Sequence, residues 1–118
     1  MTEVYGPDFI TLLVADLDAS VRFYKDKIGL TVSSEKQPHA QAFDTKPCGL
    51  AIRQSLEKIA IPGQGVIIWL RTADAAALCK TLKERGVPIV KDLQESTFGM
   101  TFSFQDPAGH VLSVHDGG

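Results

Sequence analysis

The sequence has few cysteines and no excess of charge of one sign. Cys48 and Cys79 form neither a CxxC pair nor the dense framework of a secreted disulfide-rich domain. This usage is typical of a reducing compartment, so we expect a cytoplasmic protein. Twelve basic and fourteen acidic residues are mixed along the chain and give a net charge of −2. Such an even balance of positive and negative charge predicts neither nucleic acid nor a membrane surface as a partner.

Long hydrophobic runs and several catalytic motifs are also missing. No apolar run approaches the roughly 20 residues of a membrane-spanning helix, and residues 1–5 do not resemble a signal peptide. There is no HExxH, no phosphate-binding glycine loop and no Ser-His-Asp order, so hydrolase and nucleotide chemistry have no motif here. What is present is ordinary for a globular protein, with 44% hydrophobic and 22% charged residues in 118. We therefore expect one domain over residues 1–118.

The first half of the chain, residues 7–56, has the pattern strand, helix, three strands. Its predicted strands are short β-branched or apolar runs at residues 9–15, 30–33, 41–43 and 50–53. Apolar residues recur at helical spacing after the first of these runs: Val21, Tyr24 and Ile28. Asp16 or Asp18 can cap this helix at its start, and Gly29 is expected to end it.

The second half, residues 64–116, repeats the pattern after loop residues at 62–65. Its predicted strands lie at residues 66–71, 87–90, 100–104 and 111–115. A helix is expected over residues 75–85, with Thr72 or Asp74 as its cap and Gly86 at its end.

A shift of 57 residues places Gly29 on Gly86 and Val21 on Leu78. Together with the matching order of elements, this predicts an α+β protein built from two β-α-β-β-β modules. The alternative is an unduplicated α+β sandwich with the same elements.

Two segments carry a family resemblance. Residues 14–24 (VADLDASVRFY) with Gly29-Leu30, and residues 98–110 (FGMTFSFQDPAGH), resemble the signatures of the vicinal oxygen chelate superfamily. This group includes glyoxalase I, bleomycin-resistance proteins and extradiol dioxygenases, and the pattern is nearest to metal-free bleomycin-resistance-like members. The resemblance implies curved mixed sheets around a cavity, helices on the outside, and a homodimer.

The segment Asp106-Pro107-Ala108-Gly109 also has a purely structural interpretation. Proline presets the backbone at the second position of a type I turn, aspartate at the first can accept backbone hydrogen bonds, and glycine suits the fourth. We therefore expect this segment to shape a hairpin without touching a ligand.

The resemblance also implies where metal-dependent members hold a divalent cation. Their ligands are histidine or carboxylate side chains on the first, fourth, fifth and last strands. The matching positions here are Phe9, Arg53, Ile67 and Ser113. An aromatic ring, a guanidinium, an alkyl group and a hydroxyl make no divalent-metal site, so we expect no metal and no other cofactor. A relocated site around His115 would need a carboxylate from another strand, which no motif supplies.

The resemblance implies that the metal-ligand positions face the cavity, and alternate residues of a strand face the same side. Together they give a candidate ligand-binding lining: Phe9, Thr11, Arg53, Trp69, Arg71, Ser113 and His115. The residues that alternate with these along the same strands are uniformly apolar, as a sheet face packed under helices requires. Aromatic rings stack on planar ligands, and arginine binds carboxylate or phosphate. Alternatively, Trp69 fills the core, and the two arginines reach solvent or pair with acidic neighbours. Cys79 is expected to be a small packed residue.

These observations predict a metal-independent protein that binds a small aromatic or anionic molecule, for drug or metabolite sequestration. No residue is assigned a catalytic role. The alternative is a divalent-metal lyase or isomerase like glyoxalase I, and a dioxygenase is less favoured because the iron-binding triad is absent.

Overall fold

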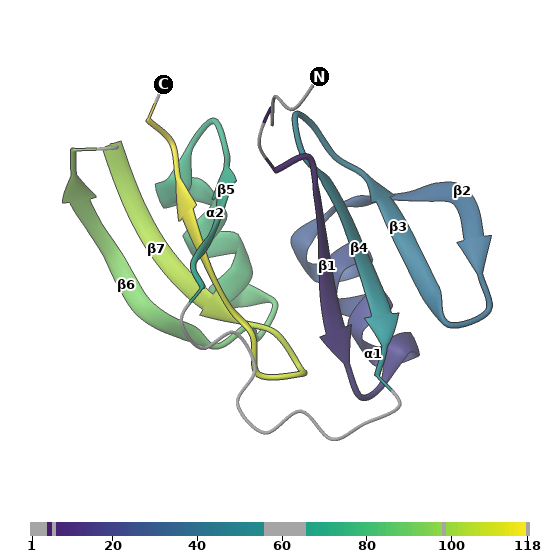
Figure 1. Ribbon diagram of the computed structural model, residues 1–118. Coiled ribbons are helices and arrows are strands. Elements are labelled where there is room, and N and C mark those ends of the chain that lie inside the picture. The colour runs from purple at the N-terminus through teal and green to yellow at the C-terminus, as the bar shows by residue number, and fades with distance from the viewer. Residues whose placement is uncertain (1–4, 6, 56–65, 98, 118) are drawn as a thin grey trace. The chain divides into compact units, whose positions relative to one another are not determined.

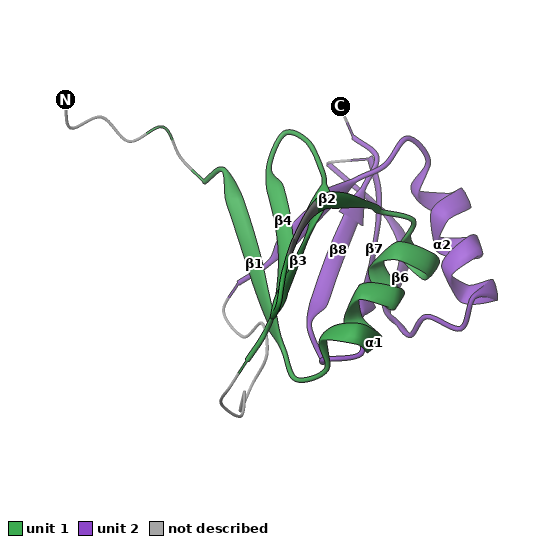
Figure 2. Cartoon of the chain, turned by 90° about the vertical axis from the view of Figure 1, so that its right-hand side faces the viewer, with its two compact units in different colours: residues 1–59 green, residues 60–118 purple. Residues whose placement is uncertain are grey.

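The computed structural model of the protein describes residues 5, 7–55, 66–97 and 99–117. The chain forms two compact units, residues 1–59 and 60–118, each with one four-stranded sheet and helical structure on one face of that sheet (Figures 1 and 2). The predicted α+β class is confirmed. The prediction of one domain over the whole chain stays a prediction. The expected loop at residues 62–65 lies outside the described residues, as does Phe98 of the second signature.

Unit 1 begins with a strand and a helix and ends with three strands. Its elements are β1 (Phe9–Val14), α1 (Leu17–Arg22), η1 (Phe23–Ile28), β2 (Thr31–Gln37), β3 (Ala40–Asp44) and β4 (Gly49–Gln54). The strand order is β1-β4-β3-β2, in which β1 runs parallel to β4 and the other pairs are antiparallel.

Unit 2 repeats this topology. Its elements are β5 (Ile68–Arg71), α2 (Ala75–Glu84), β6 (Ile89–Ser96), β7 (Gly99–Gln105) and β8 (Val111–His115). The order β5-β8-β7-β6, with a parallel β5–β8 pair, matches that of unit 1 strand for strand. The β-α-β-β-β duplication is therefore confirmed, and the unduplicated sandwich is wrong.

Matching capping residues begin and end the two helical segments. Asp16 accepts a hydrogen bond from the Ala19 amide (3.1 Å), and Asp74 accepts one from the Ala77 amide (3.0 Å). Gly29 and Gly86 follow the helical segments with φ of 94° and 77°, in the left-handed region that glycine adopts without a steric penalty. Of the alternatives that the sequence left open at each helix start, the caps are thus Asp16 and Asp74, rather than Asp18 and Thr72.

The first helical segment does not stay α-helical to its end. Residues Phe23–Ile28 form a π-helical turn, closed by the Gly29 amide donating to the Tyr24 carbonyl (3.1 Å). The wider turn lets Phe23 and Tyr24 both be buried, with their rings edge to face at 5.1 Å. The i, i+3, i+7 pattern predicted Tyr24 inside but missed Phe23, because it assumes regular α-helical spacing.

Strand lengths differ from the predictions mainly at sheet edges. The edge strands β2 and β6 extend to Gln37 and Ser96, several residues beyond the predicted runs. Their added residues are mostly polar, because an edge strand pairs on one side only and does not need an apolar pattern. The edge strand β5 begins at Ile68 rather than at residue 66.

The core of each unit lies between its sheet and its helix. Alternate apolar residues of β1, β4 and β8 are buried on the helix side: Leu12, Val14, Leu50, Ile52, Leu112 and Val114. In unit 2 the helix contributes Ala75, Cys79 and Leu82, all buried. The predicted division of each sheet into an apolar helix-covered face and a second, mixed face is therefore present. Neither helix within the described residues has the length and apolar character needed to cross a bilayer.

The β7–β8 connection is the turn expected from its sequence. Asp106 Oδ1 accepts hydrogen bonds from the amides of Ala108 (3.0 Å) and His110 (2.7 Å). The Gly109 amide donates to the Asp106 carbonyl (3.1 Å), and Gly109 has φ of 98°. All these contacts lie within the turn, so hairpin geometry accounts for the order of residues in this segment.

Asp116, just after β8, connects three parts of unit 2. Its Oδ2 accepts from the amide of Ala75 at the start of α2 (2.9 Å), and its Oδ1 accepts from the amide of Met100 in β7 (2.8 Å). These two backbone hydrogen bonds hold the pKa of Asp116 below its usual range, because they favour the ionised carboxylate. Nothing in the sequence pattern predicted this contact.

We predict that Asp116→Asn lowers the free energy of unfolding at neutral pH, because an amide supplies one acceptor oxygen where two amides donate. A carboxylate whose pKa is lowered by folding stabilises the folded state fully at pH values above its pKa in the unfolded chain, about 4. This stabilisation is lost as the pH falls through the lower pKa of the folded state. Urea unfolding between neutral and acid pH should therefore show the variant and parent converging at low pH. Asp44→Asn, at an exposed carboxylate on β3, is the control; parallel curves for Asp116→Asn and the parent would contradict the prediction.

Candidate functional site

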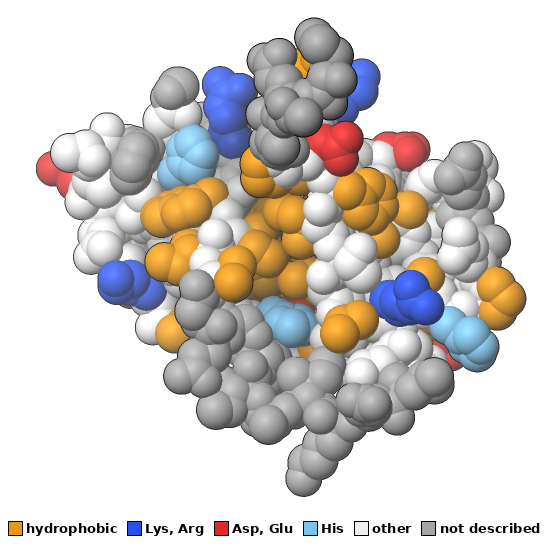
Figure 3. Space-filling model, in the orientation of Figure 1, with side chains coloured by type: hydrophobic (Ala, Val, Ile, Leu, Met, Phe, Trp, Pro, Cys, Tyr) orange, Lys and Arg blue, Asp and Glu red, His pale blue; other side chains and the backbone are white. Residues whose placement is uncertain are grey.

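Each sheet has a face that its helix does not cover, and the predicted lining residues lie on these two faces. The face of unit 1 carries Phe9, Thr11 and Arg53. The face of unit 2 carries Trp69, Arg71, Ser113 and His115. The space-filling view shows hydrophobic side chains exposed beside Lys, Arg and His side chains (Figure 3). The two groups are described separately, and their union in one site stays a prediction.

The unit-1 face combines two exposed apolar side chains with very small neighbours. Phe9 is 56% exposed and Leu13 is 44% exposed, on the edge strand β1. Beside them β4 and β3 present the small residues Gly49, Ala51 and Ala42. The Phe9 ring lies across Gly49, where its Cδ2 would be 2.6 Å from a Cβ at residue 49. An exposed aromatic ring next to a sheet surface of glycine and alanine is suited to contact with a flat apolar molecule.

Arg53 lies at the other end of this face. It pairs with Leu13, four residues along β1 from Phe9, and its side chain is exposed. No carboxylate pairs with it among the residues that the structure describes. Among the described residues Arg53 thus reaches solvent rather than an acidic neighbour, and its role in ligand binding stays a prediction.

The unit-2 face is centred on an aromatic pair. The rings of Trp69 on β5 and His115 on β8 meet edge to face, with centroids 5.8 Å apart and planes at 74°. Trp69 is 47% exposed, so the interpretation of this residue as core filling is wrong. A half-exposed indole beside a second ring presents aromatic surface of the kind that stacks on planar molecules.

Hydroxyl groups occupy the strands next to this pair. Ser103 on β7 and Ser113 on β8 are direct partners, and their Oγ atoms are 2.9 Å apart. Thr101 lies opposite His115 in the same ladder. The sequence analysis missed Thr101 and Ser103, although their alternation with the buried Phe102 and Phe104 is a signal that could have found them.

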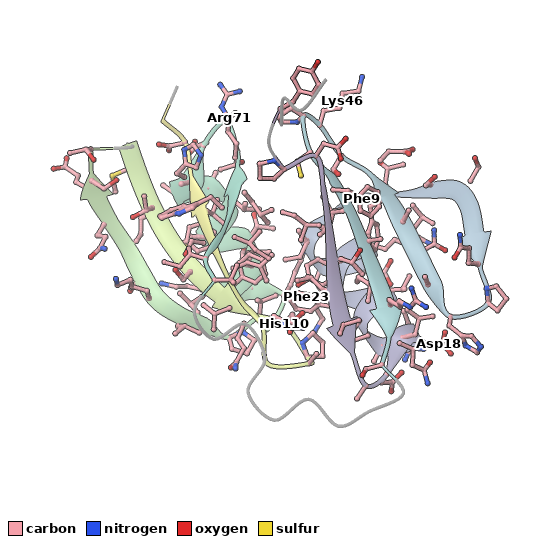
Figure 4. The ribbon with its side chains drawn as sticks, in the orientation of Figure 1. Phe9, Asp18, Phe23, Lys46, Arg71 and His110 are labelled. Carbon is pink, nitrogen blue, oxygen red and sulfur yellow. The ribbon has the colours of Figure 1, made fainter. Side chains whose placement is uncertain are left out.

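Arg71 closes the face at the C-terminal end of β5, where its side chain extends beyond the strand (Figure 4). It is the register partner of His115, and the Thr72 amide donates to the His115 carbonyl (3.0 Å) just beyond that pair. Like Arg53, Arg71 has no carboxylate partner within the described part of the chain. A guanidinium next to an imidazole and an indole can bind an anionic group attached to an aromatic one.

The remaining histidines and cysteines do not join these faces into a reactive site. His39 is exposed in the β2–β3 turn, and His110 is buried in the β7–β8 turn. Cys79 is buried in α2, and this burial raises the pKa of its thiol, as expected for a packed residue. Cys48 is half-buried before β4.

The positions that hold metal in metal-dependent members do not fit a divalent cation here. Phe9 faces Gly49 across the β1–β4 pair, and Trp69 faces Ser113 across the β5–β8 pair, so none of these neighbours is a carboxylate or an imidazole. Ile67 lies just before β5 and is 70% exposed. No three His, Cys, Asp or Glu side chains cluster among the described residues. That the protein needs no metal stays a prediction.

The fold defines a protein with two β-α-β-β-β units, each with one sheet face that its helix leaves uncovered. A family model described as Glyoxalase/Bleomycin resistance protein/Dioxygenase superfamily matches residues 6–114. The chain belongs to this superfamily, which confirms the resemblance found in its sequence.

Solved structures of similar fold include binding proteins and an enzyme. TnmS3, an antibiotic binding protein from Streptomyces sp. CB03234, has a TM-score of 0.77 and 20% identity over all of both chains. A glyoxalase/bleomycin resistance protein from the same organism has a TM-score of 0.73 and 22% identity, over 94% of this chain and 100% of its own. Lactoylglutathione lyase from Agrobacterium tumefaciens has a TM-score of 0.73 and 21% identity, over 97% and 95% of the two chains. Comparison with curated protein sequences gives no significant match.

We predict that the effect of Gly49→Ala depends on Phe9. With Phe9 present, the new methyl group displaces the ring from its place across β4, and the protein is not stabilised. In a Phe9→Ala background the same change gains about 0.5 kcal/mol, because alanine loses less backbone entropy than glycine on folding into a strand. Urea unfolding of the four proteins in this cycle measures the coupling; additive effects would contradict the placement of the Phe9 ring.

Proposed function

We propose that the protein binds a small aromatic or anionic molecule without a metal ion and acts by sequestering a drug or metabolite. The half-exposed Trp69, held beside His115 and Arg71, carries this proposal. Burying an indole against a planar ligand gains both hydrophobic and stacking free energy, whereas the same surface left in water gains neither. The proposal includes a homodimer in the cytoplasm.

Several further observations support binding over catalysis. The helix-free faces combine exposed apolar side chains with two arginines that have no carboxylate partner among the described residues. The hydroxyls of Ser103 and Ser113 are hydrogen-bonded to each other, and the sequence offers no nucleophile motif around them. One protein of similar fold is described as binding an antibiotic, which supports the same class of activity for this chain.

The second candidate is a metal-dependent lyase or isomerase, favoured by one observation. A lactoylglutathione lyase shares this fold over nearly the whole of both chains. Such chemistry uses a divalent ion to stabilise an enediolate, and the residues at the corresponding positions here lack the required donors. Turnover of a hemithioacetal by the metal-supplemented protein would establish this candidate. A dioxygenase has the further requirement of an iron-binding triad of two histidines and a carboxylate.

We predict that Trp69→Ala and Arg53→Ala both weaken retention of ligands from a library of aromatic acids. Trp69→Ala should weaken compounds bound on the unit-2 face, and Arg53→Ala those bound on the unit-1 face, each about tenfold. Retained compounds are identified by mass spectrometry after gel filtration of protein and library.

Two variants serve as controls for this experiment. Tyr5→Ala removes an aromatic ring that is 91% exposed, and Lys80→Gln removes a positive charge from the outer surface of α2. Both should retain the parental set of compounds. If Trp69→Ala and Arg53→Ala retain it equally well, the assignment of these faces to ligand binding is wrong.

A further inference from the structure

The two exposed arginines of the helix-free faces have different surroundings. Arg53 pairs with Leu13 on β1 and with Ala40 on β3, so its neighbours on the face are apolar. Arg71 pairs with His115, whose ring contacts Trp69, and Thr101 lies on the far side of His115. Only the second arrangement places a cation, a titratable imidazole and an aromatic surface together.

The carboxylate that follows His115 in the chain does not neutralise Arg71. Asp116 follows His115 directly, but its two oxygens accept from the amides of Ala75 and Met100. Both of its carboxylate oxygens are thus hydrogen-bonded, one to the start of α2 and one to β7. No ion pair joins Asp116 to Arg71 in the described part of the chain. The guanidinium therefore remains available for an anion from outside the protein.

The spacing along β5 gives the site a direction. Trp69 and Arg71 are two residues apart on the same strand and face the same side, which separates their Cα atoms by roughly 6.6 Å. An aromatic ring over Trp69 thus places a directly attached acid group toward Arg71 and His115. Amides and esters of the same ring would lack the charge that these two groups recognise.

We propose that Arg71 and His115 bind the carboxylate of an aromatic acid whose ring packs on Trp69. This inference rests on the small-molecule-binding function proposed above and assigns the anionic group of the ligand to unit 2. The charged groups around His115 are Arg71 on β5 and Asp116, the residue that follows β8, while β7 contributes the uncharged Thr101.

The single tryptophan of the chain provides a direct readout. The ¹⁵N-labelled protein has one indole N–H cross-peak, which belongs to Trp69. It is titrated at neutral pH with 2-naphthoate and with the uncharged 2-naphthamide. The parent should bind naphthoate about tenfold more tightly than naphthamide.

Matched variants separate the contributions of the two residues. Arg71→Gln should abolish the preference for the acid, and Arg71→Lys should restore part of it. His115→Gln should reduce the preference for the acid without abolishing it, because Arg71 remains. Lys80→Gln, which removes one positive charge from α2, should behave as the parent, and the unfolding temperature of each variant confirms that it is folded.

Other outcomes overturn the proposal in distinguishable ways. If acid and amide bind equally and both shift the indole cross-peak, the carboxylate assignment is wrong and the aromatic-binding function stands. If the acid preference disappears in Arg53→Gln but survives in Arg71→Gln, the anion binds on unit 1 instead. If neither probe shifts the cross-peak at saturating concentration, both this inference and ligand binding at Trp69 are contradicted.

Discussion

The covering of one sheet face by helical structure is the constraint on which the rest of this structure depends. In each unit alternate side chains of the parallel pair, such as Leu12 and Val14 or Leu112 and Val114, are buried on the helix side. Because successive strand residues point to opposite faces, burying these side chains places the intervening ones on the uncovered face. Trp69, Arg71 and His115 are there because Ile68, Leu70 and Val114 are on the helix side. A one-residue slip of register would exchange the two sets.

Much of the fold was predictable because its signals are local. The capping aspartates Asp16 and Asp74 and the terminal glycines Gly29 and Gly86 mark both helical segments, and they occur at nearly equal spacing. What the sequence did not reveal depends on non-local structure. The full lengths of β2 and β6 depend on pairing at sheet edges, and the Asp116 contacts join residues 16 and 41 positions away.

The candidate site was predictable in part, for the same reason. Alternation placed the predicted side chains on the uncovered faces, but it gave neither the ring contact between Trp69 and His115 nor the hydroxyl pair of Ser103 and Ser113. Those contacts depend on which strands are neighbours and in what register. The β1–β4 register places Gly49 beside Phe9 and Leu13 beside Arg53, and counting along the sequence did not give these pairs.

The central claim is that these faces bind molecules through rings and guanidinium groups and without a metal ion. It is tested most directly by the metal stoichiometry of the tag-free protein after exposure to Ni²⁺, Zn²⁺, Mn²⁺ and Fe²⁺ and then dialysis. We expect less than about a tenth of an ion per chain and no thermal stabilisation by any of the four ions. One tightly held ion per chain would contradict the claim and make a glyoxalase-like enzyme the leading interpretation.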